Sequence, residues 1–122
     1  GFESVTFPPT NWARFAGPGN GSAEDWQRQT NQSHSGSASA GIEYDGSNTV
    51  DRFLATSQLD LSQVSNTQLE FWHRDNWASY YNYHGVWAST ASQTNPGDYS
   101  EVVETGPTAE DSWEVYNVDL SA

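Results

Sequence analysis

Strict alternation of side-chain character over residues 68–74 is the feature that most limits what this chain can fold into. Successive side chains of an extended strand point to opposite faces of a sheet. Leu69 and Phe71 therefore share one face, whereas Trp72 and Arg74 lie on the other. This period of two is typical of a β-strand that is buried on one side only.

A second outward tryptophan occurs in the next predicted strand, residues 85–90. Val86 takes the inward position there, and Trp87 takes the outward one. Core packing does not explain two indoles on the polar face of a sheet. The alternation therefore predicts that Trp72 and Trp87 belong to a surface that stacks on a ligand.

The rest of the chain is interrupted by turn residues at short intervals, as in an all-β domain. The pattern predicts strands at residues 2–7, 38–44, 51–57, 68–74, 85–90, 99–105 and 113–120, with a long surface loop over residues 16–37. No segment has a convincing helical period. We therefore expect a single domain over residues 1–122, an antiparallel β-sandwich of jelly-roll type.

Composition excludes several classes of function. Sixteen acidic residues against four arginines give a net charge of −12, which repels nucleic acid and anionic membranes and attracts divalent cations such as Ca²⁺. The chain has no cysteine, so it has no disulfide, no thiol nucleophile and no thiolate zinc site. A lysine-free acidic surface is common in proteins exposed to salt, and this favours a secreted, extracellular or cell-surface protein.

The segment between the two outward tryptophans is the candidate ligand-binding site. We expect Trp72 and Trp87 to form a platform for sugar rings or a peptide, and other residues to supply hydrogen bonds around it. The candidate binding residues are Trp72, Arg74, Trp77, Tyr80, Tyr81, Tyr83, His84 and Trp87. Two alternatives stay open: a loop or neighbouring domain covers the two tryptophans, or the aromatic residues pack only on one another.

Nothing in the chain favours an enzyme. His73-Arg74-Asp75 matches the catalytic-loop tripeptide of kinases in spelling only, because a kinase also needs a lysine and a nucleotide-binding lobe. Arg74 is expected to pair with Glu70 on the outer face of the strand, or to cap the platform. The histidines show no metal-ligand spacing, so no zinc site is expected.

Fragments spread along the whole chain carry a family resemblance. They are Gly1-Phe2-Glu3, Phe7-Pro8-Pro9 before Trp12, residues 33–40, Leu59-Asp60-Leu61-Ser62, residues 69–74, residues 86–90, Asp98-Tyr99-Ser100, and Trp113 followed by residues 118–121. In order and spacing they resemble the cleaved-adhesin or "choice-of-anchor J" modules of bacterial secreted proteins, which are relatives of MAM domains.

The resemblance implies a jelly-roll module that binds rather than catalyses, with a structural Ca²⁺. The Glu3 carboxylate and backbone carbonyls of the turn at Ser33, Ser35 and Gly36 would be the calcium ligands. Members of that family usually continue with a closing strand after the segment that matches residues 118–121. The sequence therefore leads us to expect a domain that is incomplete at its C-terminus, with the remaining strands truncated or supplied by another chain.

Two functions fit these expectations. The first is a non-catalytic module that binds polysaccharide or a cell-surface glycan through its aromatic residues. The second is a structural or adhesive subunit of a surface or filament assembly, which binds other protein chains or domains by strand addition. Neither involves nucleic acid or insertion into a membrane.

Overall fold

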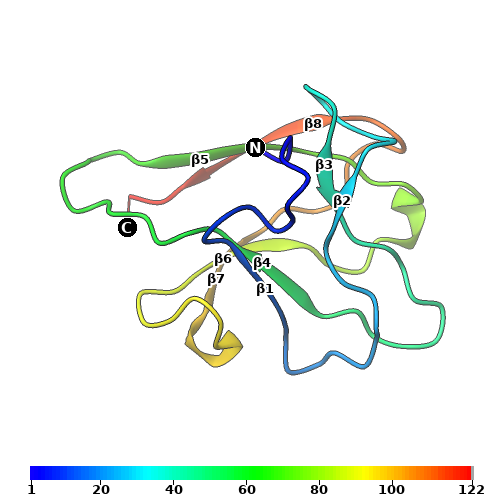
Figure 1. Ribbon diagram of the computed structural model, residues 1–122, viewed down its shortest axis with the longest axis horizontal. Helices are drawn as coiled ribbons and strands as arrows, with labels where there is room; N and C mark the ends of the chain where they lie inside the picture. Colours follow the sequence, from blue (N-terminus) through cyan, green and yellow to red (C-terminus); the bar gives the residue numbers. More distant parts are fainter. Residues whose placement is uncertain (122) are drawn as a thin grey trace. The chain divides into compact units, whose positions relative to one another are not determined.

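The computed structural model describes residues 1–121, and its regular secondary structure is almost entirely short antiparallel strands joined by irregular segments (Figure 1). The strands are β1 (Ala13–Ala16), β2 (Gln27–Gln29), β3 (Ser39–Gly41), β4 (Arg52–Ala55), β5 (Gln68–His73), β6 (Gly85–Ala88), β7 (Ser100–Glu104) and β8 (Glu114–Asp119). Two single-turn 3₁₀ helices, η1 (Ala78–Tyr80) and η2 (Pro96–Asp98), complete the set. The prediction of an all-β, antiparallel chain is confirmed. Among the described residues, no helix is long and apolar enough to cross a membrane.

The chain forms two compact units. The first comprises Gly1–Leu59 and Ala91–Asp98, and the second comprises Asp60–Thr90 and Tyr99–Ala122. The first unit holds the strand pairs β1–β4 and β2–β3, and the second holds β5–β8 and β6–β7. Each pair is a two-stranded antiparallel sheet.

Aromatic stacking across β1 and β4 holds the first unit together. Phe15 and Phe53 are opposite one another in the register, and their rings stack at a centroid distance of 5.0 Å with an interplanar angle of 6°. Trp26 donates its indole N–H to the Arg52 carbonyl at 3.1 Å. The polar stretch around Trp26 contains β2, a strand that the sequence pattern did not predict.

The N-terminal segment is the one predicted strand that the structure contradicts. Residues 2–7 form no strand, and Val5 is 90% exposed. The side chain of Arg28 binds this segment instead, by donating to the carbonyls of Phe2 at 2.8 Å and Glu3 at 3.1 Å. These carbonyls are therefore bound by a side chain and not by a neighbouring strand.

Alternation in β5 and β8 is the strongest success of the sequence pattern. Along β5 the exposed residues Gln68, Glu70 and Trp72 alternate with the less exposed Leu69, Phe71 and His73. β8 lies beside β5 (Figure 1), with Leu69 opposite Val118 and Phe71 opposite Tyr116. Val118 is 3% exposed, so the face that carries Leu69 and Phe71 is the buried one.

The β6–β7 sheet is irregular at the site of its tryptophan. Val86 pairs with Val103, but Trp87 pairs with Glu101, so the register shifts between Val86 and Trp87. Such a bulge re-aims a side chain relative to a regular ladder. Trp87 is 37% exposed, and its ring reaches solvent from this sheet.

The core of each unit is thin. Ala38 in the first unit and Val118 in the second are the buried apolar residues, and no large side chain among residues 1–121 is fully buried. Many large apolar side chains are instead partly exposed. Stability therefore depends strongly on aromatic pairs and on hydrogen bonds from charged side chains.

Candidate functional site

Exposed aromatic side chains of the second unit lie in β5 and in the segment between β5 and β6. Trp77 and Tyr80 are the most exposed, at 71% and 79% of their surface, and Trp72 is 42% exposed. The ring centroids of Trp77 and Tyr80 are 6.4 Å apart, and the interplanar angle between the two rings is 67°. The most exposed aromatic pair of this unit is thus Trp77 and Tyr80, which the sequence analysis placed around the platform of Trp72 and Trp87.

An unusual backbone conformation presents Trp77. Its φ of 63° and ψ of 44° are left-handed, a region that bulky residues seldom adopt. The Glu110 carboxylate holds this conformation, because it accepts the N–H of Trp77 at 2.6 Å and the N–H of Ala78 at 2.7 Å. Such strain costs about 1–3 kcal/mol and persists only where the surroundings impose it.

The two platform tryptophans lie in different sheets. Trp72 is in β5, opposite Val115 of β8, and Trp87 is in β6, opposite Glu101 of β7. Both are partly exposed, as the alternation predicts, although they do not occupy one continuous ladder.

The hydroxyl groups of two candidate binding residues, Tyr81 and Tyr83, already form hydrogen bonds within the protein. Tyr81 donates its hydroxyl to Glu104 at 2.5 Å, and Tyr83 donates its hydroxyl to Glu101 at 2.8 Å. The Trp87 indole N–H donates to the Tyr83 oxygen at 2.6 Å. Desolvation, together with the carboxylate of Glu101, raises the pKa of Tyr83 to about 12. Tyr81 and Tyr83 therefore fix the aromatic surface and do not offer a spare proton to a ligand.

Arg74 does not pair with Glu70, and that expectation is wrong. Its guanidinium donates to the Asp111 carbonyl at 3.0 Å, to the Asp111 carboxylate at 2.7 Å and to the Asn76 side chain at 2.5 Å. The Arg74 side chain is 11% exposed. It therefore supports the loop that begins at Asn76 and is only weakly available to a ligand.

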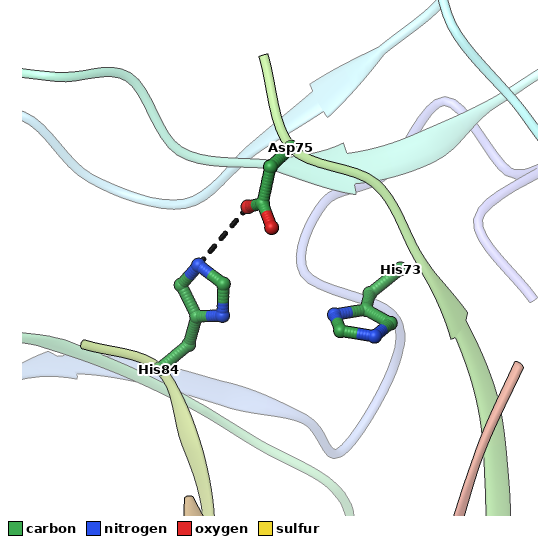
Figure 2. A group of neighbouring side chains, drawn as sticks. All are labelled: His73, Asp75 and His84. Atoms are coloured by element: carbon green, nitrogen blue, oxygen red, sulfur yellow. Dashed lines mark ion pairs between the residues drawn. The ribbon is translucent and has the colours of Figure 1, made fainter. Parts of the chain in front are cut away.

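Two histidines that look unrelated in sequence come together with an aspartate. One ring nitrogen each of His73 and His84 and one Asp75 oxygen lie within 4.8 Å of one another. Figure 2 shows the three side chains facing a shared space, with the ion pair from His84 Nε2 to Asp75 Oδ1 at 3.0 Å. Burial lowers the pKa of His73, which favours its neutral, ligating form. The sequence analysis missed this cluster.

A signal for the cluster is present in the sequence. His73 and Asp75 are two residues apart, which puts their side chains on the same side of an extended chain. His84 immediately precedes β6, so only the packing of the second unit brings it to them. Spacing in the sequence therefore does not predict that His84 joins His73 and Asp75.

The structure brings Glu3 to the predicted calcium turn. Its carboxylate accepts the N–H of Ser37 at 3.1 Å and the hydroxyl of Ser37 at 2.5 Å, and these bonds lower the pKa of Glu3. Gly36 is left-handed, with φ 67°, and a side chain there would collide with the Glu3 carboxylate. The Ser33 hydroxyl donates to the Gly36 carbonyl at 3.2 Å. Glu3 thus lies beside Gly36 and Ser37, where donors of Ser37 bind its carboxylate.

A separate hollow in the second unit lies away from the aromatic residues named above. It has a volume of about 440 Å³ and is lined by Leu61, Val64, Ser65, Asn66, Thr67, Leu120 and Ser121. The exposed aromatic residues therefore do not line this hollow.

Comparison of the chain with family models, with curated proteins and with solved structures finds no match.

Proposed function

We propose that this chain is a non-catalytic, extracellular module that binds polysaccharide or a cell-surface glycan on exposed aromatic rings. The accompanying fold proposal is a jelly-roll β-sandwich. Its support is the alternation along β5 and β8 and the antiparallel pairing of every described strand. The secreted location rests on the acidic, lysine-free composition.

The observation that carries the proposal is the exposed pair Trp77 and Tyr80. The left-handed backbone of Trp77 is energetically unfavourable. The hydrogen bond to Glu110 maintains this conformation, and Trp77 is 71% exposed. Backbone strain of this kind gathers at functional sites. An aromatic ring offers a flat apolar face to the C–H face of a pyranose, and its exposure without a ligand would otherwise favour aggregation.

Three further residues extend this surface. Trp72 and Trp87 are partly exposed within the same unit and would contact more distant sugar rings of a polymer. Tyr83 supports Trp87 through its hydroxyl oxygen. The proposal therefore assigns the main contact to Trp77 and Tyr80, and a secondary one to Trp72 and Trp87.

Affinity electrophoresis against a panel of soluble polysaccharides tests this function. Trp77→Ala should weaken the retardation caused by any bound polysaccharide at least about 10-fold, as expected for a tryptophan that supplies 1.4 kcal/mol or more. Tyr44→Ala is the matched control, because it removes an aromatic side chain that is 86% exposed in the first unit. Equal retardation of the native chain and Trp77→Ala on every polysaccharide would exclude the proposed surface.

We further propose a structural Ca²⁺ at Glu3 with the carbonyls of Ser33, Ser35 and Gly36. Carboxylate and carbonyl oxygens are the ligands that Ca²⁺ prefers, and the support for this site is that the Glu3 carboxylate lies against the backbone of Gly36 and Ser37. Binding would require the Ser37 hydroxyl to release part of the carboxylate.

Removal of calcium by EGTA should therefore lower the thermal midpoint of the chain. At a free Ca²⁺ concentration ten times Kd, binding to the native state alone contributes RT ln 11, or about 1.4 kcal/mol. Differential scanning calorimetry with Ca²⁺ and with EGTA measures the shift. Glu3→Gln should abolish it, and a midpoint that EGTA leaves unchanged in the native chain would refute the site.

One observation favours the alternative, a structural or adhesive subunit. Each described strand has a single hydrogen-bonded neighbour, so its other edge can accept a strand from another protein. Size-exclusion chromatography with light scattering separates the two functions. A stoichiometric assembly would favour the subunit, and a stable monomer would favour the glycan-binding module.

A further inference from the structure

We propose that His73, Asp75 and His84 form a binding site for a first-row divalent transition metal ion of the Zn²⁺ type. The site lies wholly within the second unit and shares no residue with the proposed calcium site or with the main glycan contacts, Trp77 and Tyr80. It is the one group of three potential metal ligands found within residues 1–121.

Distances between the ligand atoms are close to those of a metal site. Zn²⁺ binds imidazole nitrogen and carboxylate oxygen at about 2.0–2.2 Å, so two ligands on one tetrahedral ion lie about 3.3–3.6 Å apart. His84 Nε2 and Asp75 Oδ1 are 3.0 Å apart, and all three ligand atoms lie within 4.8 Å of one another. Small side-chain rotations would close the remaining gap, because the rings already face a shared space (Figure 2).

Outer hydrogen bonds hold Asp75 in place. The Thr108 N–H donates to Asp75 Oδ2 at 2.7 Å, and the Asp75 N–H donates to the Thr108 hydroxyl at 2.9 Å. Thr108 is buried. Asp75 Oδ1 is left facing the two histidines, as a carboxylate ligand with a fixed orientation requires.

His84 has a comparable outer partner. The Thr105 hydroxyl donates to the His84 carbonyl at 3.2 Å, and its oxygen lies 3.4 Å from His84 Nδ1. Because the hydroxyl proton is used on the carbonyl, the Thr105 oxygen is an acceptor for an N–H on Nδ1. A cation bound at His84 Nε2 would replace the proton of the ion pair with Asp75, and the Asp75 carboxylate would favour it.

The donor set selects the class of metal. Two imidazoles and one carboxylate suit Zn²⁺, Fe²⁺, Ni²⁺ or Cu²⁺, whereas Ca²⁺ and Mg²⁺ prefer oxygen ligands. Three protein ligands leave a coordination position for water or for a donor atom of a bound molecule. The His84 side chain is 42% exposed, which gives an ion a route from solvent.

A bound ion would connect three parts of the second unit. His73 ends β5, Asp75 belongs to the turn after it, and His84 precedes β6. The loop that contains Trp77 and Tyr80 lies between Asp75 and His84 in the chain. Metal binding would therefore fix both ends of this loop.

Isothermal titration with Zn²⁺ in the presence of excess Ca²⁺ tests the proposal on the full chain. We expect one Zn²⁺ per chain, with affinity that His73→Gln and His84→Gln each reduce. Loss of an outer partner of a metal ligand costs roughly 10–100-fold in affinity, so loss of a ligand should cost at least that, and Thr105→Val should cost about 10-fold. His34→Gln is the matched control, because His34 belongs to the first unit, and it should leave affinity unchanged.

Ring ¹⁵N chemical shifts of the native chain give a second test that needs no variant. Sub-stoichiometric Zn²⁺ should shift the ring nitrogens of His73 and His84 and leave those of His34 in place. A simple ion pair between His84 and Asp75 predicts no zinc-dependent shift of His73. Unchanged shifts of His73 and His84, absence of Zn²⁺ binding, or an equal loss of affinity in His34→Gln would overturn the proposal. Trp77→Ala should retain zinc binding. Failure of the glycan proposal can therefore be distinguished from failure of the zinc site.

Discussion

Replacement of Phe53 by alanine should lower the free energy of unfolding of the first unit by about 3 kcal/mol, the lower end of the range for removal of a phenylalanine from a protein core. Phe53 is half-buried and stacks on Phe15 across β1 and β4 at 5.0 Å. Loss of the ring removes both the apolar contact and the stacking term. Ala38 is the buried apolar residue of this unit, so no large buried side chain of the unit compensates for the loss.

Urea denaturation followed by NMR signals from β1 and β4 measures this effect. Phe53→Leu is the matched control, since it keeps most of the apolar volume and should cost less than about 1.5 kcal/mol. Val5→Ala, at a side chain that is 90% exposed, should be close to neutral. A loss below 1 kcal/mol for Phe53→Ala would mean that the aromatic pair does not support the unit.

Replacement of Arg74 by alanine should cost about 2 kcal/mol of stability in the second unit. Hydrogen bonds that involve a charged group contribute roughly 1.5–3 kcal/mol, and Arg74 makes such bonds to the Asp111 carbonyl, the Asp111 carboxylate and Asn76. The Asp111 side chain is 54% exposed, so water replaces part of what is lost. The expected loss of stability for Arg74→Ala therefore lies toward the low end of this range.

Asp111→Asn is the informative control for Arg74. Asp111 has a φ of 58°, a conformation that asparagine also tolerates, so this change removes the charge without adding backbone strain. It should destabilise by less than Arg74→Ala, because the carbonyl of residue 111 still accepts from the guanidinium. Urea titration of both variants, followed by signals from β5 and β8, measures the difference. A larger loss in Asp111→Asn than in Arg74→Ala would contradict the assigned role of the guanidinium.

Strand positions were predictable where one face of a sheet is buried. The alternation of Leu69 and Phe71 with Trp72 gave the correct inward face for β5, which pairs with β8 at the buried Val118. β2 was missed because Gln27–Gln29 is short and polar and has no apolar face. Residues 2–7 were predicted as a strand and form none, and the Arg28 side chain binds the carbonyls of Phe2 and Glu3.

The site was predictable in composition but not in its detailed contacts. Exposure of Trp72 and Trp87 followed from local periodicity, whereas the preference of Arg74 for Asp111 over Glu70 depends on a residue far along the chain. His84 joins His73 and Asp75 for the same reason. Periodicity reports the direction of a side chain relative to its own strand, and it holds no information about which distant segment lies opposite.

The hydrogen bonds that the N–H groups of Trp77 and Ala78 donate to Glu110 have a consequence for the binding of a ligand. Ordering a mobile residue costs about 1–2 kcal/mol of conformational entropy, and a flexible loop incurs this cost each time it captures a ligand. In this chain, folding has already ordered the backbone of Trp77 and Ala78. A saccharide would therefore meet an indole with its main-chain torsions already set, and its affinity would not be reduced by an induced loop rearrangement.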